Sequence, residues 1–321
     1  MNILQFTSTL LAVAMVVGTA HAQTVGVGTT KGGANARIVA SISKIVTLNT
    51  DVKMRPQPMG GSQQYLPIVD AGDLAFGVTN MPQYNMGKHG FGLSKRKYTN
   101  LRLAATMMKF QVGILVPKKA GINKPEDLKG HRYPVRFRSA PLIGLIMQAN
   151  LLHVNLSEKD IVPVPVVGLR QHWNLLKQGK IDAATAAVGS GPVKDMNASI
   201  SGGVKFVSMR NTPASRAAVL AIYPKSWIET IQPNKKLVGF DKPLNALSYD
   251  YMLWTHKGLS DEIVYKTVKA MYENEKGLRE TSPLWRSHRS ANMAKAQGAG
   301  PEGVYHPGAV KFYKEAGIWK R

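Results

Sequence analysis

The sequence contains no cysteine in its 321 residues. This absence excludes disulfide bonds, thiolate metal ligands and cysteine nucleophiles, and it excludes a lipoprotein anchor, which needs a cysteine at the cleavage point. Acidic residues are scarce as well, because 19 Asp and Glu stand against 42 Lys and Arg, for a net charge of +23. The basic residues are dispersed along the chain, so two interpretations stay open: a solvated basic surface, or an excess of charge that attracts anions.

Long apolar runs are also few. The uncharged run from Thr9 to Thr19 is too short to span a bilayer, and no longer run follows it. Ala20-His21-Ala22 then places small residues at the two positions that signal peptidase reads. We therefore predict a signal peptide over residues 1–22, cleaved near Ala22, and a soluble periplasmic protein that begins at Gln23; a buried N-terminal helix is the alternative. Because an exported protein meets little nucleic acid, we expect no nucleic-acid partner.

One stretch of the chain occurs twice. The sequence from Pro58 reads PMGGSQQYLPIVDAGDLAFGVTN and that from Pro165 reads PVVGLRQHWNLLKQGKIDAATAAV, so a constant offset of 107 (165 − 58) aligns them without a gap. Each copy has the pattern of a strand, a Gly loop, a short helix, a Gly that ends the helix, and an apolar strand. The repeat predicts two related α/β lobes with the same loop from each facing a shared cleft. A chance resemblance between two ordinary units is the alternative.

A glycine-rich loop follows the first predicted strand. The strand covers Thr24–Val27, and the loop Gly28-Thr29-Thr30-Lys31-Gly32-Gly33 leads into a helix predicted over Ala34–Val46. Backbone N–H groups at a helix start bind anions readily. A dinucleotide fingerprint needs glycine where Lys31 stands, and a P-loop needs Gly-Lys-Ser/Thr at its end. We therefore expect no nucleotide and no other cofactor.

Polar residues mark the start of one predicted helix and the end of one predicted strand. Ser62 follows Gly60-Gly61, where it could serve as the N-cap of the helix or contact a ligand. The strand predicted over Leu74–Val78 ends at Thr79-Asn80. Ligands bind at this edge of open α/β sheets.

Two arginines follow a strand predicted over Tyr133–Phe137. Arg136 and Arg138 are two residues apart, which places them on the same face of an extended strand. They precede an apolar helix, and the two-point fork of an arginine suits a carboxylate. The pair therefore predicts a carboxylate clamp, although both side chains could instead face water.

Two long apolar segments predict the path of the chain between the lobes. Leu101–Val116 and the aromatic-rich Leu247–Trp254 are both suited to extended crossings. The resulting division gives residues 23–115 to the first part of lobe 1, residues 116–240 to lobe 2, and residues 241–321 to the return crossing and the rest of lobe 1. Residues 81–100 are predicted to be a loop excursion, because glycines and basic residues interrupt them.

No catalytic or metal-binding pattern is apparent. The eight His are scattered, and neither a zinc motif nor a pair of carboxylates is visible. Gly189-Ser190-Gly191 is not the Gly-x-Ser-x-Gly elbow of hydrolases, and no neighbouring residue supplies a base. His306, before Pro307, is predicted to be structural. We therefore predict a binding protein without enzymatic activity, with an exported enzyme and a charge-driven binder of anionic polymers as the alternatives.

Several segments together resemble the TAXI subgroup of the extracytoplasmic solute receptors of tripartite ATP-independent periplasmic (TRAP) transporters. The resemblance covers nearly the whole mature chain, and its most specific piece is the His-Pro-Gly-Ala sequence that begins at His306. The other pieces are GVGTTKGG at 26–33, GGSQQYLPIVDAGDLAFGVTN at 60–80, GINKPEDLKGHR at 121–132, LLKQGKIDAAT at 175–185 and LSDEIVYKTVKAMYEN at 259–274.

The resemblance implies a two-lobed α/β fold like that of type II periplasmic binding proteins, with a ligand cleft that closes on binding. It implies a small anionic solute such as a dicarboxylate, an oxoacid or an acidic amino acid, delivery to TRAP membrane subunits, and a monomer. Whether a metal ion assists in holding a carboxylate stays open. The ligand loops it implies are Thr29-Thr30, Gly61-Ser62, Thr79-Asn80, Arg138-Ser139 and Gly189-Ser190.

The chain departs from the family pattern at two places in the implied cleft. Aromatic residues usually follow the first Gly-Gly, where this chain has Ala34-Asn35-Ala36-Arg37. The loop at 136–141 is usually glycine-rich, and here it reads Arg-Phe-Arg-Ser-Ala-Pro. Both departures add positive charge, which favours an anionic ligand.

Overall fold

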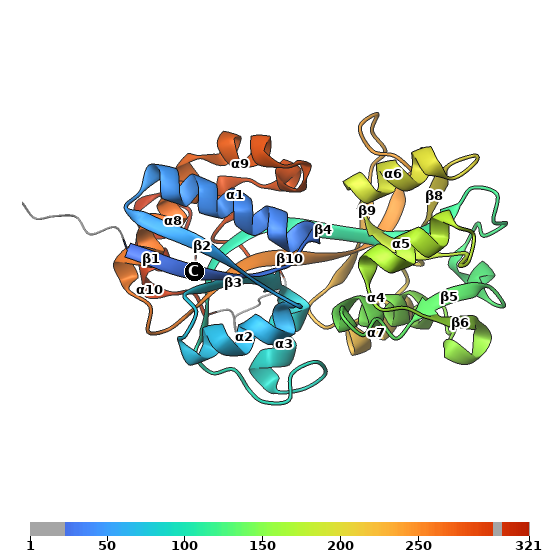
Figure 1. Cartoon of the computed structure of the whole chain (residues 1–321), viewed down its shortest axis with the longest axis horizontal. Helices are drawn as coiled ribbons and strands as arrows, with labels where there is room; N and C mark the ends of the chain where they lie inside the picture. Colours follow the sequence, from blue (N-terminus) through green and yellow to red (C-terminus); the bar gives the residue numbers. More distant parts are fainter. Residues whose placement is uncertain (1–22, 298–303, 321) are drawn as a thin grey trace, which may run out of the picture.

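The computed structural model describes residues 23–297 and 304–320, so the predicted signal peptide lies outside the described residues. In the described part the chain forms two α/β lobes joined by two long strands, β4 (Leu101–Pro117) and β10 (Leu244–His256) (Figure 1). The two strands are antiparallel neighbours over most of their length. The predicted two-lobed α/β fold is confirmed, and both crossings follow the segments that their apolar sequences indicated.

The predicted division of the chain at residues 115 and 240 stays a prediction. Residue 115 lies inside β4, and residue 240 lies just before β10. Both strands contribute hydrogen bonds to sheet partners in each lobe, since β10 pairs with β3 (Phe76–Asn80) and with β9 (Trp227–Ile231). A strand that is shared in this way belongs to neither lobe alone.

Lobe 1 is built on a sheet whose strands lie in the order β2, β1, β3, β10, β4. β1 (Gln23–Thr30) is parallel to both β2 (Val52–Met59) and β3, and β2 lies at the edge of the sheet, where its prolines are tolerated. Its helices are α1 (Gly33–Asn49), α2 (Ser62–Ala71), α3 (Met81–His89), α8 (Asp261–Glu273), α9 (Glu275–Thr281) and α10 (Pro307–Glu315), with short turns η3 (Pro283–Ser287) and η4 (Ser290–Asn292).

Lobe 2 uses the far ends of β4 and β10 as its centre. β7 (Ala184–Ala187) and β8 (Val204–Val207) pair with β4 in antiparallel fashion, while β5 (Arg132–Val135) and β6 (Val162–Pro165) form a separate parallel pair. The helices of lobe 2 are α4 (Pro141–Leu152), α5 (Leu169–Lys177), α6 (Gly191–Ser199) and α7 (Pro213–Ile222), with short turns η1 (Pro125–Leu128) and η2 (Glu158–Asp160).

The sheet of lobe 1 is held by a continuous apolar core. Trp254 of β10 is fully buried, and its ring stacks on that of Tyr84 with 3.9 Å between the centroids. Val27, Ile38 and Phe76 are also fully buried and bring β1, α1 and β3 into the same core. Burial on this scale is the main stabilising contribution to the fold. None of the described helices is both long enough and apolar enough to span a bilayer.

Three local expectations are corrected. Residues 81–89 form α3 rather than a loop, because Asn80 caps the helix by accepting a hydrogen bond from the Gln83 N–H and a proline stands in its first turn. Ser62 is not the N-cap of α2, since Gly61 holds that position and the Ser62 hydroxyl bonds elsewhere. β5 ends at Val135, and Arg136 has a φ of 73°, so Arg136 and Arg138 do not share a strand face.

Candidate functional site

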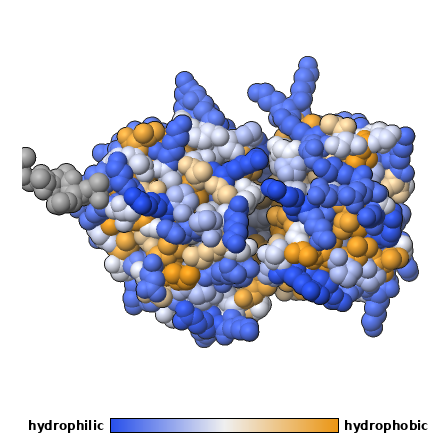
Figure 2. All heavy atoms as spheres, viewed as in Figure 1, coloured by the Kyte–Doolittle hydropathy of each residue, from blue (hydrophilic) through white to orange (hydrophobic). Residues whose placement is uncertain are grey.

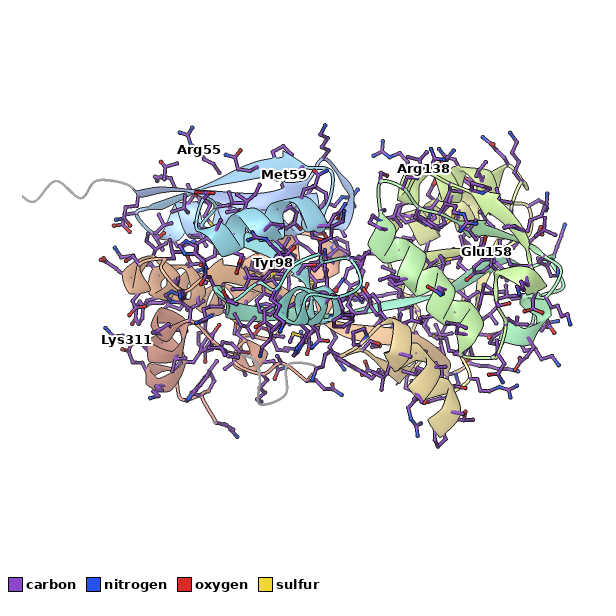
Figure 3. All side chains as sticks on the ribbon, turned by 90° about the horizontal axis from the view of Figure 1, so that it is seen from below. Arg55, Met59, Tyr98, Arg138, Glu158 and Lys311 are labelled. Carbon is purple, nitrogen blue, oxygen red and sulfur yellow. The ribbon has the colours of Figure 1, made fainter. Side chains whose placement is uncertain are left out.

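The two lobes face each other across a hollow. Figure 2 shows this depression between the halves of the molecule. On the lobe 1 side, β1 and β2 end toward lobe 2 and α1 and α2 begin there (Figure 1). Figure 3 places Met59 and Arg138 on opposite sides of the gap. The guanidinium of Arg286, in η3, reaches across the gap and donates to the Val188 carbonyl of lobe 2 at 2.7 Å. Loops from both lobes therefore meet at one place.

The repeated sequence forms the same turn in each lobe. In the first copy the Gly60 N–H donates to Gln64 Oε1 at 2.7 Å, and in the second the Val167 N–H donates to Gln171 Oε1 at 2.5 Å. The two donors and the two acceptors are each separated by the sequence offset of 107 residues. Glycine, at Gly61 and at Gly168, is the N-cap of both helices. The repeat is therefore structural, as predicted.

A second matched contact fixes each helix to its following strand. The Tyr65 hydroxyl donates to the Val78 carbonyl at 2.5 Å. At the same offset, His172 Nε2 lies 3.1 Å from the Thr185 carbonyl, which it can only contact as a donor. Burial lowers the pKa of His172 to about 4, so the ring is neutral at pH 7. In each copy a polar side chain of the helix thus joins that helix to the strand that follows it.

The lobe 1 wall contains a network of hydroxyl and amide groups. Ser62 and Thr79 both donate to Gln83 Oε1, the latter at 2.7 Å. All three side chains are at least nine-tenths buried, as is Asn80, whose side chain caps α3. The Thr29 hydroxyl is buried at the end of β1 and has no hydrogen-bond partner. The structure thus brings four predicted residues of lobe 1 to one end of the sheet, and of their hydroxyl groups only that of Thr29 has no partner among the described residues.

The remaining predicted residues of lobe 1 lie on the loops themselves. Gly61 is buried at the start of α2, and Thr30 is half-buried at the end of β1. The Thr30 hydroxyl donates to the Gly32 carbonyl at 2.6 Å, which closes the turn between β1 and α1. Both loops leave helix N-termini facing lobe 2, and N–H groups of a first helical turn have no intrahelical partners.

Tyrosines from the shared strand β10 and from α2 adjoin this wall. Asn35 at the start of α1 donates to the Tyr65 hydroxyl at 3.1 Å and accepts a hydrogen bond from the Tyr251 hydroxyl. The ring of Tyr251 lies 5.4 Å from that of Phe110 on β4. Burial raises the pKa of both Tyr65 and Tyr251, which keeps their hydroxyls neutral. Asn35 lies at one of the two places where the sequence departs from the TAXI pattern. Its hydrogen bonds are to Tyr65 and Tyr251, which lie 30 and 216 residues away in the chain.

The lobe 2 wall is more exposed and carries fewer internal contacts. The Ser139 hydroxyl donates to the Val167 carbonyl at 2.8 Å and thereby joins the starts of α4 and α5. Arg138 is exposed and forms no hydrogen bond or ion pair with any described residue. Arg136 points to Glu158, with 2.6 Å between Nη2 and Oε1, and its side chain is 61% exposed. The two arginines therefore have different surroundings.

The loop between β7 and α6 contributes the last two predicted residues. Gly189 has a φ of 75°, a conformation that side chains other than glycine rarely adopt. Ser190 is the N-cap of α6, yet its buried hydroxyl makes no capping hydrogen bond and has no other partner in residues 23–297 and 304–320. Arg286 and Arg37, which the sequence did not single out, both approach this loop.

The candidate residues include no group suited to general acid–base or metal chemistry. Within the part of the chain that the structure describes, no cluster of three His, Asp or Glu could hold a metal ion. His306 is fully buried and accepts a hydrogen bond from the Gly308 N–H at 3.2 Å, which makes it the N-cap of α10. This position agrees with the predicted structural role. The arrangement can donate hydrogen bonds and offer positive charge, which is the chemistry of binding.

Two hollows elsewhere on the molecule do not coincide with these loops. One, of about 740 Å³, is lined by α8 residues together with Asp51 and Lys311. The other, of about 490 Å³, is lined by residues of β4 and η4 and by Asp250 of β10. Neither includes any of the predicted site residues, so the candidate site rests on the convergence of the loops at the hollow between the lobes.

Two α/β lobes joined by two long strands are also the fold of solved solute-binding proteins. The TctC solute-binding protein from Polaromonas superposes with a TM-score of 0.53 at 15% identity, covering 92% of this chain and 96% of that chain. The malate-bound MatC protein from Rhodopseudomonas palustris gives a TM-score of 0.53 at 14% identity, covering 92% and 97%. At such identities the likeness establishes the fold alone. By its sequence from residue 26 to residue 317, the chain belongs to the NMT1-like family.

Proposed function

We propose that the protein is an exported receptor that captures a small organic anion between its lobes. The observation that carries this proposal is the charge of the loops that face the hollow. The segments 28–37, 58–65, 78–86, 136–142, 166–171 and 188–193 contain no Asp or Glu, and they contain Lys31, Arg37, Arg136, Arg138 and Arg170. Helix N-termini add backbone donors, which also favour anions.

The solute class that fits is a dicarboxylate, an oxoacid or an acidic amino acid. Neutral hydroxyl and amide donors of the lobe 1 wall, such as those of Asn35 and Tyr251, suit a compact polar molecule. Closure of the lobes would remove water from the ligand and strengthen each contact with it. The proposed ligand contacts are Thr29, Thr30, Gly61, Ser62, Thr79, Asn80, Arg138, Ser139, Gly189 and Ser190, with Arg136 at the outer margin beside Glu158.

The proposed partner is the membrane part of a TRAP transporter, with the chain acting as a TAXI-type receptor. The sequence pieces that resemble this subgroup support the assignment, and membership of the NMT1-like family and the solute-binding fold are consistent with it. In this role the protein works as a monomer in the periplasm after removal of residues 1–22, and it returns its ligand unchanged. Formation of a product from bound ligand would revive the enzyme interpretation.

A thermal-shift screen tests the proposal. The mature protein from Gln23 onward would be heated with dicarboxylates, oxoacids, amino acids and sugars, at low and at moderate salt. A ligand that binds only the folded state raises the melting temperature by mass action. We expect a shift with one class of small anion that persists at moderate salt, because the contacts form in a closed cleft.

The second candidate function is binding of an anionic polymer or envelope surface, which the net charge of +23 favours. Its signature differs from that of a receptor, because the affinity of a polyanion for dispersed Lys and Arg falls steeply with salt. Heparin or polyphosphate binding that disappears at moderate salt, with no thermal shift from any small solute, would support this function and contradict the receptor.

A further inference from the structure

Arg286 carries a positive charge that no described carboxylate neutralises. The guanidinium donates to the Val188 carbonyl, and no ion pair involves it among the residues that the structure describes. Burial lowers its pKa, and no acidic group acts in the opposite direction. Its neighbour Trp285 is fully buried, which anchors the turn η3 and holds the arginine toward lobe 2. A partly buried guanidinium without a counter-ion is a costly arrangement for the protein alone.

The loop that Arg286 reaches carries polar groups that suit an anionic ligand. A Cβ atom at Gly189 would lie 2.8 Å from Leu237 Cδ2 and 3.3 Å from Arg286 Cζ, so glycine allows both side chains to approach the backbone here. α6 begins two residues later, and because Pro192 has no N–H, the first-turn donors without an intrahelical acceptor are the N–H groups of Gly191 and Val193. The Ser190 hydroxyl is buried, does not cap the helix and has no partner. An unsatisfied buried hydroxyl at this point indicates a missing acceptor.

A second arginine approaches the same helix end from lobe 1. Arg37 Nη1 lies 4.0 Å from the position that a Cβ atom of Gly191 would occupy. Its guanidinium is exposed and makes no hydrogen bond or ion pair with the described residues. Figure 1 shows the start of α1 and the helix α6 on the two sides of the gap. Two guanidinium groups of one lobe, neither with a carboxylate partner in the described chain, thus flank a helix N-terminus of the other.

We propose that Arg286 and Arg37 of lobe 1, with Ser190 and the first turn of α6 of lobe 2, form a subsite that holds one carboxylate of the captured solute. The inference rests on the proposed function, and it identifies the residues that would bind a carboxylate of the solute when the cleft is closed. A carboxylate here accepts hydrogen bonds from the Ser190 hydroxyl and from backbone N–H groups, and its single negative charge offsets part of the charge of the two guanidinium groups. Because its partners come from both lobes, the same anion would hold the lobes together. Arg138, on another loop of lobe 2, is left for a second carboxylate.

The test uses the mature full chain and four matched Arg→Gln variants. Arg286→Gln and Arg37→Gln remove the two charges of the subsite. Arg138→Gln removes the charge assigned to the other carboxylate. Arg55→Gln is the control, because Arg55 is exposed on the outer part of β2 (Figure 3) and has no partner among the described residues. Each protein is titrated with succinate, malate, 2-oxoglutarate, glutamate and neutral sugars, and separately with millimolar sulfate at constant ionic strength. The shift is measured against the melting temperature of the same variant without ligand.

We expect Arg286→Gln to weaken binding of the stabilising anion by about 10- to 100-fold, the usual range for one charge-assisted hydrogen bond. Arg37→Gln weakens it in the same direction and, because its guanidinium makes no internal contact, tests the subsite even if Arg286→Gln folds poorly. Arg55→Gln binds as the wild type does.

Several results would separate the subsite from the receptor function. If an organic anion binds wild type, Arg286→Gln and Arg37→Gln equally, the subsite is wrong and the receptor stands. A neutral sugar as the sole ligand would overturn both the subsite and the proposed anionic solute, and would leave a receptor for another class of solute. If no organic solute binds, but sulfate stabilises the wild type and neither subsite variant, the subsite stands and the proposed solute class is wrong. Absence of any response overturns both.

Discussion

The two copies of the repeated unit begin with the same turn and differ in what surrounds them. In lobe 1 the Tyr65 hydroxyl donates to Val78 and accepts from Asn35, so the contact belongs to a buried network that continues to Tyr251. In lobe 2 His172 packs edge-on against Phe137 with 5.2 Å between ring centroids, and its Nδ1 atom is buried without a partner. One copy is therefore tied to its lobe through hydrogen bonds and the other mainly through packing.

This difference extends to the walls that the copies support. The lobe 1 wall is buried and its hydroxyls are largely paired with one another, as at Ser62 and Thr79. In lobe 2, Val167 is 54% exposed and Arg138 is exposed as well. The buried lobe 1 wall is preorganised and can define the shape of the ligand. The exposed lobe 2 wall can then close over the bound ligand.

The largest expected effect comes from removing the tyrosine of the first copy. Tyr65→Ala should lower the free energy of unfolding by about 3–5 kcal/mol, the usual cost of deleting a fully buried aromatic side chain. Its ring is closely enclosed, since a Cβ atom at Gly28 or Gly77 would lie 2.7 or 3.1 Å from it. Urea unfolding of the variant and of His172→Ala measures the difference. His172→Ala should cost less, because the imidazole fills less space; equal costs would contradict the comparison.

Acid should weaken the second copy and leave the first unaffected. Burial holds the pKa of His172 at about 4 in the folded state, against about 6.5 when unfolded, so the unfolded chain binds more protons between these values. Stability is then complete above pH 6.5 and falls as the pH drops toward 4, by about 3 kcal/mol for this residue. His172→Gln should remove that part of the loss, and a pH series of urea midpoints measures it. Parallel pH curves for wild type and variant would be the contrary result.

Removing only the hydrogen-bonding atoms of Tyr65 and His172 should lower the free energy of unfolding by less than removing the whole side chains does. Tyr65→Phe deletes the side-chain donor to the Val78 carbonyl and leaves Asn35 Nδ2 without its acceptor, at a cost of about 1–3 kcal/mol. His172→Phe should cost less than this, because Trp173 Nε1 also donates to the Thr185 carbonyl, at 2.9 Å. Calorimetry on the two variants compares them. A larger loss for His172→Phe would mean that the shared donor does not compensate.

The smallest loss of stability is expected from the glutamines of the two turns, and it should be equal in both copies. Gln64→Ala and Gln171→Ala each remove one side-chain acceptor from an exposed turn before a helix, at an expected cost of about 0.5–1.5 kcal/mol. Because the two contacts have the same separation of four residues, the costs should agree within about 0.5 kcal/mol. Thermal unfolding of both variants, with Gln178→Ala as a control at an exposed site, measures this. Clearly unequal costs would show that the turns differ in energy despite their shared geometry.

Elements that depend on contacts within one short segment could be predicted from the amino-acid sequence. The turn at Gly60 and Gln64 and its copy at Val167 and Gln171 are closed over four residues, and a glycine with positive φ lies at or just beyond the end of both helices. Long apolar segments likewise indicated β4 and β10. Such features are legible because the residues that make them are neighbours in the chain. The helix α3 escaped notice because Gly87 interrupts its apolar pattern, although Asn80 and Pro82 mark its start.

The polar groups that the candidate cleft contains depend instead on tertiary packing. Arg286 meets Val188 across 98 residues, and Tyr251 meets Asn35 across 216. No local pattern distinguishes these side chains from other exposed arginines or strand tyrosines, because their environment is created when β4 and β10 bring two lobes together. For the same reason the sequence does not distinguish Arg136 from Arg138, while in the fold Arg136 is paired with Glu158 and Arg138 has no partner in the described part of the chain. The identity of a site that lies between lobes is a property of long-range contacts, and these are set by the packing of the whole chain.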